Sequence, residues 1–255
     1  MKLTNNTFLI TGGGSGLGRA CVERFHGAGA NVVIADLNEI AGNELAAQLG
    51  TRASFVRADV TDEASVQNAI GFATKTGGGL HGVVHCAGIL GAARIVGKNG
   101  PHDLVLFRRV LDVNLTGTFN VLRLAAVAMQ ANPPNPDGER GVLVATSSVA
   151  ADDGQIGQAA YAASKAGVSG LMLPLARELA RFGIRAVAIA PGVFETPMMT
   201  AASPEIRDSL AAQVPFPPRF GQPEEFAALA QHIVENPYLN GTTIRLDAAL
   251  RMGAK

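Results

Sequence analysis

Tyr161 and Lys165 are the two residues whose types and spacing best suit proton chemistry, and they lie four residues apart in Gln-Ala-Ala-Tyr-Ala-Ala-Ser-Lys. Residues at positions i and i+4 share one face of a helix. A neighbouring cation favours the phenolate and so lowers the pKa of a tyrosine, which is about 10 when unperturbed. Ser148 lies thirteen residues before Tyr161, and its hydroxyl could hold the substrate oxygen whose proton the tyrosine accepts. The same spacing also fits an ordinary surface pair, so its interpretation depends on the rest of the chain.

A glycine-rich turn near the start of the chain indicates where a cofactor could bind. The sequence Thr-Gly-Gly-Gly-Ser-Gly-Leu-Gly, ending at Gly18, follows an apolar run and precedes a helix-patterned segment at residues 17–28. Strand, glycine turn and helix in this order form the context of a dinucleotide-binding motif. Gly12, Gly16 and Gly18 let the backbone approach a pyrophosphate, and the helix N-terminus supplies N–H donors. A flexible glycine loop is the alternative.

The second apolar run ends in Asp36, which favours NAD over NADP. A carboxylate at the end of the second strand accepts hydrogen bonds from the adenosine ribose, and it repels a 2′-phosphate. None of the next three residues is an arginine or a lysine, and Arg19 belongs to the helix after the glycine turn. We therefore predict NAD as the cofactor.

Apolar runs typical of strands alternate with helix-patterned segments along the whole chain. The strand-like runs are residues 8–11, 32–35, 54–57, 82–85, 142–146, 186–190 and 243–246, and the helical segments are residues 17–28, 40–49, 63–75, 104–130, 159–181 and 223–235. A repeated β-α-β order predicts a parallel sheet, and continuously apolar strands indicate burial on both sides. We predict one α/β domain over residues 1–255: a Rossmann-type, doubly wound, seven-stranded parallel sheet with helices on both faces.

The composition argues against several classes of partner. The chain has 255 residues, of which 47% are hydrophobic, and its 21 basic and 21 acidic residues give no net charge. The chain has no tract of lysine or arginine residues of the kind that forms a nucleic-acid surface. It also has no uncharged apolar run as long as the roughly 18 residues of a membrane span. The histidines and the two cysteines show no metal-ligand spacing, and both thiols suit a reducing compartment. The short N-terminal segment leaves no room for a signal peptide, so we expect a soluble, cytoplasmic protein.

These segments together resemble the short-chain dehydrogenase/reductase family, and the resemblance runs along the whole chain. It implies an NAD-dependent enzyme that oxidises a secondary alcohol, and the family's catalytic set matches Ser148, Tyr161, Lys165 and Asn114. Tyr161 phenolate would take the hydroxyl proton, Ser148 would orient the substrate oxygen, and Lys165 would hold the nicotinamide ribose. Asn114 would anchor a water for proton relay, and the alternative is an asparagine at a helix bend.

The resemblance also implies the binding positions. The Asn-Asn-Ala-Gly element of the family appears as His-Cys-Ala-Gly at residues 85–88, and its adenine-contacting aspartate appears as Asp59. The residues expected to contact the cofactor are Gly12, Ser15, Gly16, Leu17, Gly18, Asp36, Asp59, Val60, Cys86, Ala87, Gly88, Tyr161, Lys165, Pro191, Phe194 and Thr196. The residues expected to contact the substrate are Ser148, Gln155 and Tyr161, and none is expected to bind a metal.

Within the family, several stretches resemble the type-2 3-hydroxyacyl-CoA dehydrogenases. They are residues 111–120, 154–165, 213–217 and 244–252, together with insertions at 90–103 and 131–140. This implies oxidation of a short-chain or 2-methyl-branched (S)-3-hydroxyacyl-CoA to the 3-oxoacyl-CoA, with Arg94, Lys98 and Arg219 as loop candidates for the CoA phosphates. A 3-oxoacyl carrier reductase and a hydroxysteroid or polyol dehydrogenase remain alternatives. A non-catalytic NAD-binding scaffold would have no need for the intact serine, tyrosine and lysine.

Four departures from the family pattern bear on the site, and one of them, Cys86 for the second asparagine of the Asn-Asn-Ala-Gly element, also occurs in the type-2 enzymes. His85 replaces an asparagine, and we interpret it as a structural hydrogen-bonding residue rather than a general base. Asp152 stands where the subgroup carries an aromatic residue, and Glu195 replaces a small residue beside the nicotinamide side. Both acids are expected near the substrate cavity, where they would disfavour an apolar acyl chain, and exposed loop acids are the alternative.

The resemblance further implies a lid and an oligomer. Residues 196–220, with five prolines, are expected to form a mobile covering segment over the substrate, although an ordinary long connection is the alternative. The segment 159–181 is rich in alanine and glycine, and small residues permit close approach of helices. Family members pair through this helix and the one at 104–130, so we expect a homotetramer.

Overall fold

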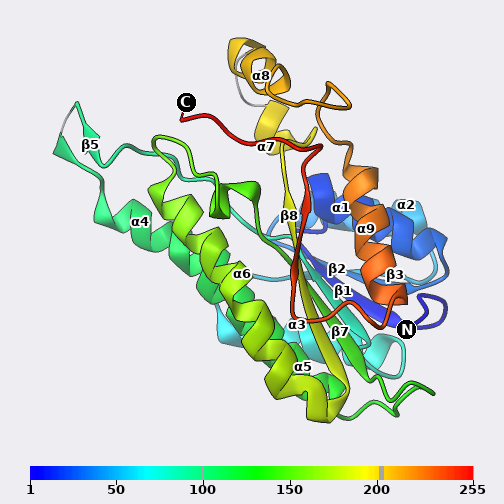
Figure 1. Ribbon diagram of the computed structural model, residues 1–255. Helices are drawn as coiled ribbons and strands as arrows, with labels where there is room; N and C mark the ends of the chain where they lie inside the picture. The colour runs from blue at the N-terminus through cyan, green and yellow to red at the C-terminus, as the bar shows by residue number, and fades with distance from the viewer. Residues whose placement is uncertain (99, 201–203, 255) are drawn as a thin grey trace.

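A seven-stranded, fully parallel sheet forms the centre of the protein (Figure 1). The computed structural model describes residues 1–98, 100–200 and 204–254. The strand order is β3-β2-β1-β4-β7-β8-β9. The strands are β1 (Thr7–Thr11), β2 (Asn31–Asp36), β3 (Ala53–Arg57), β4 (Gly82–His85), β7 (Gly141–Thr146), β8 (Ile184–Pro191) and β9 (Thr243–Leu246). All seven predicted strands are confirmed, and so is the doubly wound fold.

Helices cover both faces of the sheet, because successive strand side chains point to opposite sides. Phe8 and Ile10 of β1 pack in one buried cluster with α1 and α9, whereas Leu9 packs in the other with α3, α5 and α6. The first layer holds α1 (Gly16–Gly27), α2 (Glu39–Leu49) and α9 (Pro223–Glu235), and the second holds α3 (Glu63–Thr76), α4 (Leu104–Leu111), α5 (Gly117–Met129) and α6 (Ala159–Leu179).

The chain reverses its direction of travel across the sheet between β1 and β4, which are neighbours in register from Phe8 opposite Gly82 to Thr11 opposite His85. From β1 the chain moves outward through β2 and β3, and from β4 it moves outward the other way through β7, β8 and β9. In open parallel sheets, ligands bind beyond the carboxyl ends of the strands at such a switch point. The fold therefore predicts a ligand site at the loops that follow these two strands.

Three details differ from the sequence-based expectation. The segment 104–130 is not one regular helix, because a π-helical turn, η1 (Asp112–Thr116), separates α4 from α5. The insertion at 90–103 contains a two-stranded antiparallel hairpin of β5 (Val96–Gly97) and β6 (Gly100–Pro101), which projects from the body in Figure 1. The segment 159–181 ends its α-helix at Leu179 and continues as a 3-10 turn, η3 (Ala180–Phe182).

Among the described residues one helical stretch, Leu104–Met129, has the length and mean hydropathy of a membrane span. Of the most apolar part of this stretch, 56% is buried inside the protein. A core helix of this fold passes the same test of length and composition, and the packing of α5 against α3 and the sheet accounts for its apolar face.

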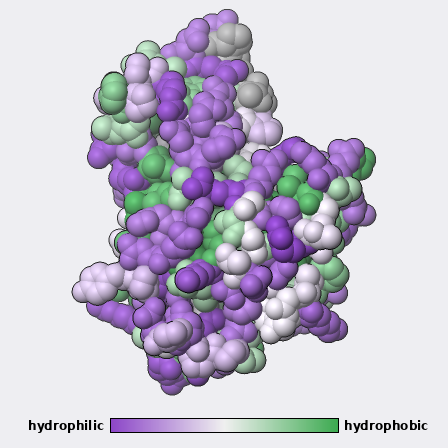
Figure 2. Space-filling view, turned by 90° about the vertical axis from the view of Figure 1, so that its right-hand side faces the viewer, coloured by the Kyte–Doolittle hydropathy of each residue, from purple (hydrophilic) through white to green (hydrophobic). Residues whose placement is uncertain are grey.

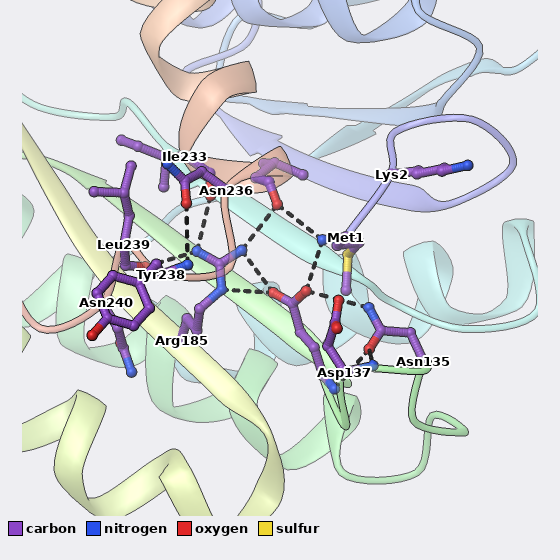
Figure 3. Close-up of polar contacts among 12 residues, drawn as sticks. Met1, Lys2, Asn135, Asp137, Arg185, Ile233, Asn236, Tyr238, Leu239 and Asn240 are labelled. Carbon is purple, nitrogen blue, oxygen red and sulfur yellow. Dashed lines mark hydrogen bonds and ion pairs between the residues drawn. The ribbon is translucent and has the colours of Figure 1, made fainter.

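A buried guanidinium joins the far end of the sheet to α9 (Figure 3). Arg185 of β8 donates to Glu139 Oε1 at 2.7 Å and to the carbonyl oxygens of Ile233, Val234 and Leu239 at 2.8–2.9 Å. The Met1 ammonium lies 2.8 Å from Glu139 Oε2. The last carbonyls of a helix have no partner within the helix and favour a nearby cation. This network fixes the carboxyl end of α9 at the edge opposite the loops that build the site.

Large apolar side chains are exposed on both layers, and Ile40 of α2 in the first layer is 74% exposed. Figure 2 views the side that carries α1, α2 and α9 and shows a mostly hydrophilic face with hydrophobic colour in small patches. Several large apolar side chains on the other layer are exposed: Leu104, Val105, Phe119, Val127 and Leu173 are between 45% and 72% exposed. These residues lie on α4, α5 and α6.

Candidate active site

The turn between β1 and α1 is built for close approach of a ligand to the backbone. Gly12 has a φ of 65°, and a Cβ added there would lie 2.9 Å from Ala87 N. A Cβ on Gly18 would overlap the carbonyl of Gly12. Ser15 is the N-cap of α1 and makes no capping hydrogen bond with its side chain, and no acidic residue occupies the first helical turn. The free N–H groups and the positive end of the helix dipole fit a pyrophosphate.

Asp36 lies at the end of β2 beside this turn. Its Oδ2 accepts a hydrogen bond from Gly14 N at 2.9 Å, and its Oδ1 accepts from Asn38 N at 2.9 Å. These bonds hold the carboxylate at the position where an adenosine ribose would meet it. Arg19 donates to Glu23 on the outer side of α1 at 2.8 Å. Arg57 lies opposite Asp36 in the pairing of β2 and β3, and its Nε is 3.3 Å from Glu39 Oε1.

Asp59 and Val60 follow β3, where the adenine is expected. Asp59 Oδ1 accepts from Thr61 N at 2.9 Å and from Thr61 Oγ1 at 2.7 Å. The hydrogen bond from the Thr61 side chain is the main reason why the pKa of Asp59 is lowered. Val60 is 7% exposed and lies where a Cβ on Gly117 would strike it. A small residue at position 117 thus lets the helix layer approach this loop.

The end of β4 shows why His85 is a structural residue. Its ring is 1% exposed, and Nδ1 lies 2.8 Å from Thr11 Oγ1 on β1. The pKa of His85 is lowered to about 3, mainly because the ring is buried and secondly because of the positive charge of Lys165. A ring that is neutral and turned into the sheet supports the hydrogen-bonding interpretation. Thr146 of β7 donates to the His85 carbonyl at 2.7 Å and to Cys86 Sγ at 3.6 Å.

Ser148, Tyr161 and Lys165 come together after β7. Ser148 caps the short 3-10 turn η2 (Val149–Ala151) by accepting from Ala150 N at 3.1 Å, and its side chain also hydrogen-bonds to Tyr161. Tyr161 is in the first turn of α6 and Lys165 in the next, with Nζ 5.7 Å from the tyrosine ring centroid. Lys165 Nζ donates to the carbonyl of Thr146 at 2.7 Å. Tyr161 and Lys165 therefore lie one turn apart on α6, as their spacing in the sequence predicts.

The protonation of this pair differs from the expectation. Burial raises the pKa of Tyr161, and the hydrogen bond from Ser148 opposes this shift. Burial also lowers the pKa of Lys165 to about 8. The expectation that Lys165 lowers the tyrosine pKa is therefore not met, because burial of the phenolate is the largest effect on this group and raises its pKa.

Asn114 lies in the π-helical turn η1 beside the same residues. Its Oδ1 accepts from Ile89 N at 2.8 Å, and its Nδ2 donates to Ile89 O at 2.8 Å and to Ser164 Oγ at 3.1 Å. The side chain thus ties the loop after β4 to α6, and the helix-bend alternative describes it well. A Cβ on Gly88 would lie 3.2 Å from Asn114 Oδ1 and 3.6 Å from Lys165 Nζ, so these residues share one small volume.

The segment after β8 reaches back over the glycine turn. Gly192 N donates to Leu246 O at 2.9 Å, and Phe194 is 6% exposed. Thr196 lies so that a Cβ on Gly16 would be 3.5 Å from its side chain. The expected lid continues as α7 (Pro197–Thr200) and α8 (Pro204–Ala211), and its residues 201–203 lie outside the described part.

The two unexpected acids have arginine partners. Glu195 accepts two hydrogen bonds from Arg207 Nη2 on α8, at 2.8 and 3.1 Å. Asp152 is 3.3 Å from Arg245, which also binds Asp153 and Asp247 at 2.7 Å. Each carboxylate is thus paired with an arginine, Glu195 with Arg207 at a sequence separation of 12 and Asp152 with Arg245 at a separation of 93.

The three loop residues that were expected to bind the CoA phosphates have different surroundings. Arg219 is engaged by Glu225 through two hydrogen bonds at 2.8 and 2.9 Å, whereas Lys98 is exposed at the β5–β6 hairpin. Arg94 borders an open cavity of about 410 Å³, which lies between this hairpin and the turn before α6. Gln155 borders the same cavity and donates to Gly253 O at 3.3 Å. The residues that line this cavity include neither Ser148 nor Tyr161.

Several contributors were not recognised in the sequence. Thr146 binds Lys165 and the end of β4, and Arg207 and Arg245 bind the two unexpected acids. Neither a threonine at the end of an apolar strand nor a single arginine has a spacing in the sequence that marks it as part of a site. Among the described residues no group of three histidine, cysteine or acidic side chains could hold a metal ion.

Comparison with known proteins gives consistent results. A family profile described as short chain dehydrogenase matches residues 6–207. The chain is 52% identical to 3-hydroxyacyl-CoA dehydrogenase type-2 of Drosophila melanogaster, over 98% of this chain and 99% of the relative, and 51% identical to the Homo sapiens protein of the same name, over 96% and 94%. A crystal structure of 3-hydroxyacyl-CoA dehydrogenase type-2 from Mycobacterium avium aligns with a TM-score of 0.95 at 46% identity, covering 98% of both chains.

Proposed function

The chain belongs to the short chain dehydrogenase family, and we propose that this oxidoreductase uses NAD to oxidise a short-chain or 2-methyl-branched (S)-3-hydroxyacyl-CoA to the 3-oxoacyl-CoA. The observation that carries the proposal is the likeness to 3-hydroxyacyl-CoA dehydrogenases type-2 at about half identity over nearly the full length. The geometry agrees with it, because Ser148, Tyr161 and Lys165 lie together beyond the carboxyl end of β7.

Tyr161 is the group proposed to move the proton. Its hydroxyl, hydrogen-bonded to Ser148, would accept the proton of the substrate hydroxyl as the alcohol carbon is oxidised, and would return it in the reverse direction. The nicotinamide ring, when bound, supplies the hydride acceptor. Because burial raises the pKa of Tyr161 in the protein alone, its ionisation depends on positive charge held nearby. Lys165 is the protein's own source of that charge, and with a pKa of about 8 it is mostly protonated at neutral pH.

The choice of NAD follows from Asp36. Its carboxylate is fixed by Gly14 N and Asn38 N, and a 2′-phosphate at the same ribose would meet this negative charge. Two arginines that could offset this charge are engaged elsewhere, because Arg19 binds Glu23 and Arg57, opposite Asp36 in register, binds Glu39. We therefore propose NAD rather than NADP.

The cavity beside the β5–β6 hairpin suits the phosphate-bearing part of a CoA thioester. Arg94 lines it, and arginine binds phosphates well because its guanidinium offers several donors in one plane. Ile95, Val96 and Ile156 also line it and leave an apolar wall. We propose that CoA enters here and that the acyl chain continues toward Ser148.

A panel of alcohols tests the substrate class. We expect NADH formation from (S)-3-hydroxybutyryl-CoA and its 2-methyl form to exceed that from a hydroxysteroid or a polyol. A relative at 36% identity is named acetoacetyl-CoA reductase, so the reverse reaction with acetoacetyl-CoA and NADH or NADPH belongs in the same panel. Efficient oxidation of a steroid or polyol with no reaction of any acyl-CoA would overturn the assignment and leave only the family.

We propose a homotetramer that pairs through α4, α5 and α6. Apolar side chains such as Val105, Val127 and Leu173 are exposed on these helices, whereas Ala163 and Ala166 leave α6 without bulk on its outer face. An exposed apolar patch of this kind is typical of an interface. We also propose a reducing compartment such as the cytoplasm, because Cys21 and Cys86 are both free.

A further inference from the structure

The residues after β9 lie between the lid and the turn that precedes α6. Figure 1 shows this C-terminal segment, residues 247–254, as the red trace that passes below α8 toward the end of the chain marked C. Hydrogen bonds join it to both sides, to the residues after α8 and to the residues before α6. The roles proposed for Ser148, Tyr161 and Lys165 use no residue of this segment, so its position needs an explanation of its own.

Ion pairs fix the start of the C-terminal segment to the body of the protein. Arg245 of β9 donates to Asp247 Oδ2 and to Asp153 Oδ2, both at 2.7 Å. The next two residues, Ala248 and Ala249, have φ values of 50° and 62°. This left-handed conformation is unfavourable for residues with a Cβ and persists only where the surroundings hold it. The direction in which the segment leaves β9 is therefore set by its contacts.

The segment then supplies apolar support for the lid. Leu250 is 0% exposed and belongs to a small cluster that is separate from the two clusters of the sheet. The buried members of this cluster are Val193, Val214, Phe220 and Leu250. Leu210 and Ala211 of α8 pack against it. The lid thus rests on the C-terminal segment as well as on the ion pair of Glu195 with Arg207.

The end of the segment joins the lid to the wall of the proposed CoA cavity. Gly253 N donates to Gln213 Oε1 at 3.1 Å, two residues after α8 ends. Gly253 O accepts from Gln155 Nε2 at 3.3 Å, and Ala254 O accepts from Ile156 N at 3.0 Å. Gln155 and Ile156 line the cavity of about 410 Å³. The backbone of Gly253 therefore binds the lid through its N–H and the cavity wall through its carbonyl.

We propose that the C-terminal segment is a positioning element for the acyl-CoA, which holds α8 at a fixed distance from the Gln155–Ile156 wall and so determines how tightly the substrate is bound. This inference rests on the proposed function, because it takes the cavity beside the hairpin as the CoA site. Ser148 and Tyr161 lie on η2 and α6 and keep their own contacts without the segment. Its loss should therefore weaken substrate binding and leave the chemical step in place.

A variant that ends at Met252 tests the proposal most strongly. It lacks all three hydrogen bonds to the lid and to the cavity wall but keeps Leu250 and the ion pairs at the start of the segment. We expect KM for (S)-3-hydroxybutyryl-CoA to rise by about tenfold, while kcat stays within about threefold and the Kd of NADH within about twofold of wild type. A rise in KM without a fall in kcat is the signature of lost substrate binding.

Two substitutions at Gln213 test the single bond to the lid, and they also serve if the shortened protein does not fold. Gln213→Met keeps the length of the side chain but cannot accept from Gly253 N, so KM should rise by about two- to fivefold. Gln213→Glu keeps an acceptor oxygen and should retain the KM of wild type. Gln67→Met is the matched control, because Gln67 lies on α3 with one exposed hydrogen bond, to Glu63 at 3.0 Å.

Hydrogen exchange tests the link between the segment and the lid without any substrate. The amides of residues 205–213 should exchange at least about threefold faster in the protein that ends at Met252, and those of the sheet strands should not change. Faster exchange at α8 combined with no reaction of any acyl-CoA would overturn the proposed function and leave the link between the segment and the lid standing. The two failures can thus be told apart.

Three results would overturn the proposal. The first is a protein ending at Met252 that keeps the KM and the α8 exchange rates of wild type. The second is a parallel loss of kcat, NADH binding and acyl-CoA binding in that protein, which would indicate a general role in the fold. The third is Gln213→Glu with the same raised KM as Gln213→Met, because the contact with Gly253 would then contribute nothing.

Discussion

His85 gives a quantitative prediction about acid stability. The ring is 1% exposed and accepts or donates one hydrogen bond, to Thr11, while among the described residues its Nε2 has no partner. Its pKa in the folded protein is about 3, against an ordinary value of 6.5. Because the unfolded chain then binds more protons than the folded one, the free energy of unfolding is highest above pH 6.5 and falls as the pH drops toward 3.

The size of the effect follows from the interval between the two pKa values. Between about pH 6.5 and about pH 4.5 the histidine gains its proton in the unfolded chain but not in the folded one. This interval of about two pH units corresponds to roughly 2.7 kcal/mol of unfolding free energy. His85→Asn keeps a hydrogen-bonding side chain but cannot titrate. Relative to this variant, wild type should lose about 2–3 kcal/mol of unfolding free energy between neutral pH and about pH 4.5.

Urea unfolding at a series of pH values measures this difference. His232→Asn is the matched control, because His232 is exposed and lies outside the sheet core. The carboxylates contribute to acid unfolding in every variant and cancel in the comparison. If the wild-type and His85→Asn profiles run parallel from neutral pH to about pH 4.5, the burial of a neutral histidine is not what limits stability in acid.

Three further predictions concern the cofactor, the lid and the assembly. Asp36→Ala combined with Leu37→Arg should shift the preference from NAD toward NADP by at least roughly tenfold, since a charged hydrogen bond contributes about 1.5–3 kcal/mol; a wild type that already uses both equally would contradict the argument, as steady-state kinetics will reveal. Arg207→Ala and Glu195→Gly should each raise KM for acyl-CoA by about two- to fivefold, as expected for a partly exposed ion pair. The double variant should raise KM no more than either single variant does. Additive increases in KM would mean that the two residues do not act as a pair. Ala166→Arg should divide the assembly, and a monomeric mass of the wild type in light scattering would reject the oligomer.

The fold could be predicted from the sequence because its signals are local. Continuous apolar runs mark strands buried on both sides, and all seven lie in the sheet. The π-helical turn at Asp112–Thr116 could not be predicted, because one extra residue in a helical turn leaves the apolar pattern almost unchanged. The β5–β6 hairpin was missed because each strand has two residues, too few to show alternation.

The site was predicted in part, and the differences arise from burial and from ion pairs that form only in the folded chain. The helix spacing of Tyr161 and Lys165 fixes their geometry, but the sign of the tyrosine pKa shift depends on how many atoms bury the ring. Asp152 pairs with Arg245, 93 residues away in sequence, and Glu195 pairs with Arg207 across a turn of the lid. Charge neutralisation between distant segments is a property of the folded chain and has no spacing in the sequence.

The role of Tyr161 as the group that accepts the substrate proton is tested most directly by one paired measurement on Tyr161→Phe. The change removes a single hydroxyl and little packing, so NADH binding should stay within about two- to threefold of wild type, while kcat for NADH formation from (S)-3-hydroxybutyryl-CoA should fall by roughly 10² to 10⁴. Loss of both binding and turnover would point to a damaged fold. A variant that binds NADH normally and keeps more than about a twentieth of wild-type kcat would contradict the account, because the proton would then leave by another route.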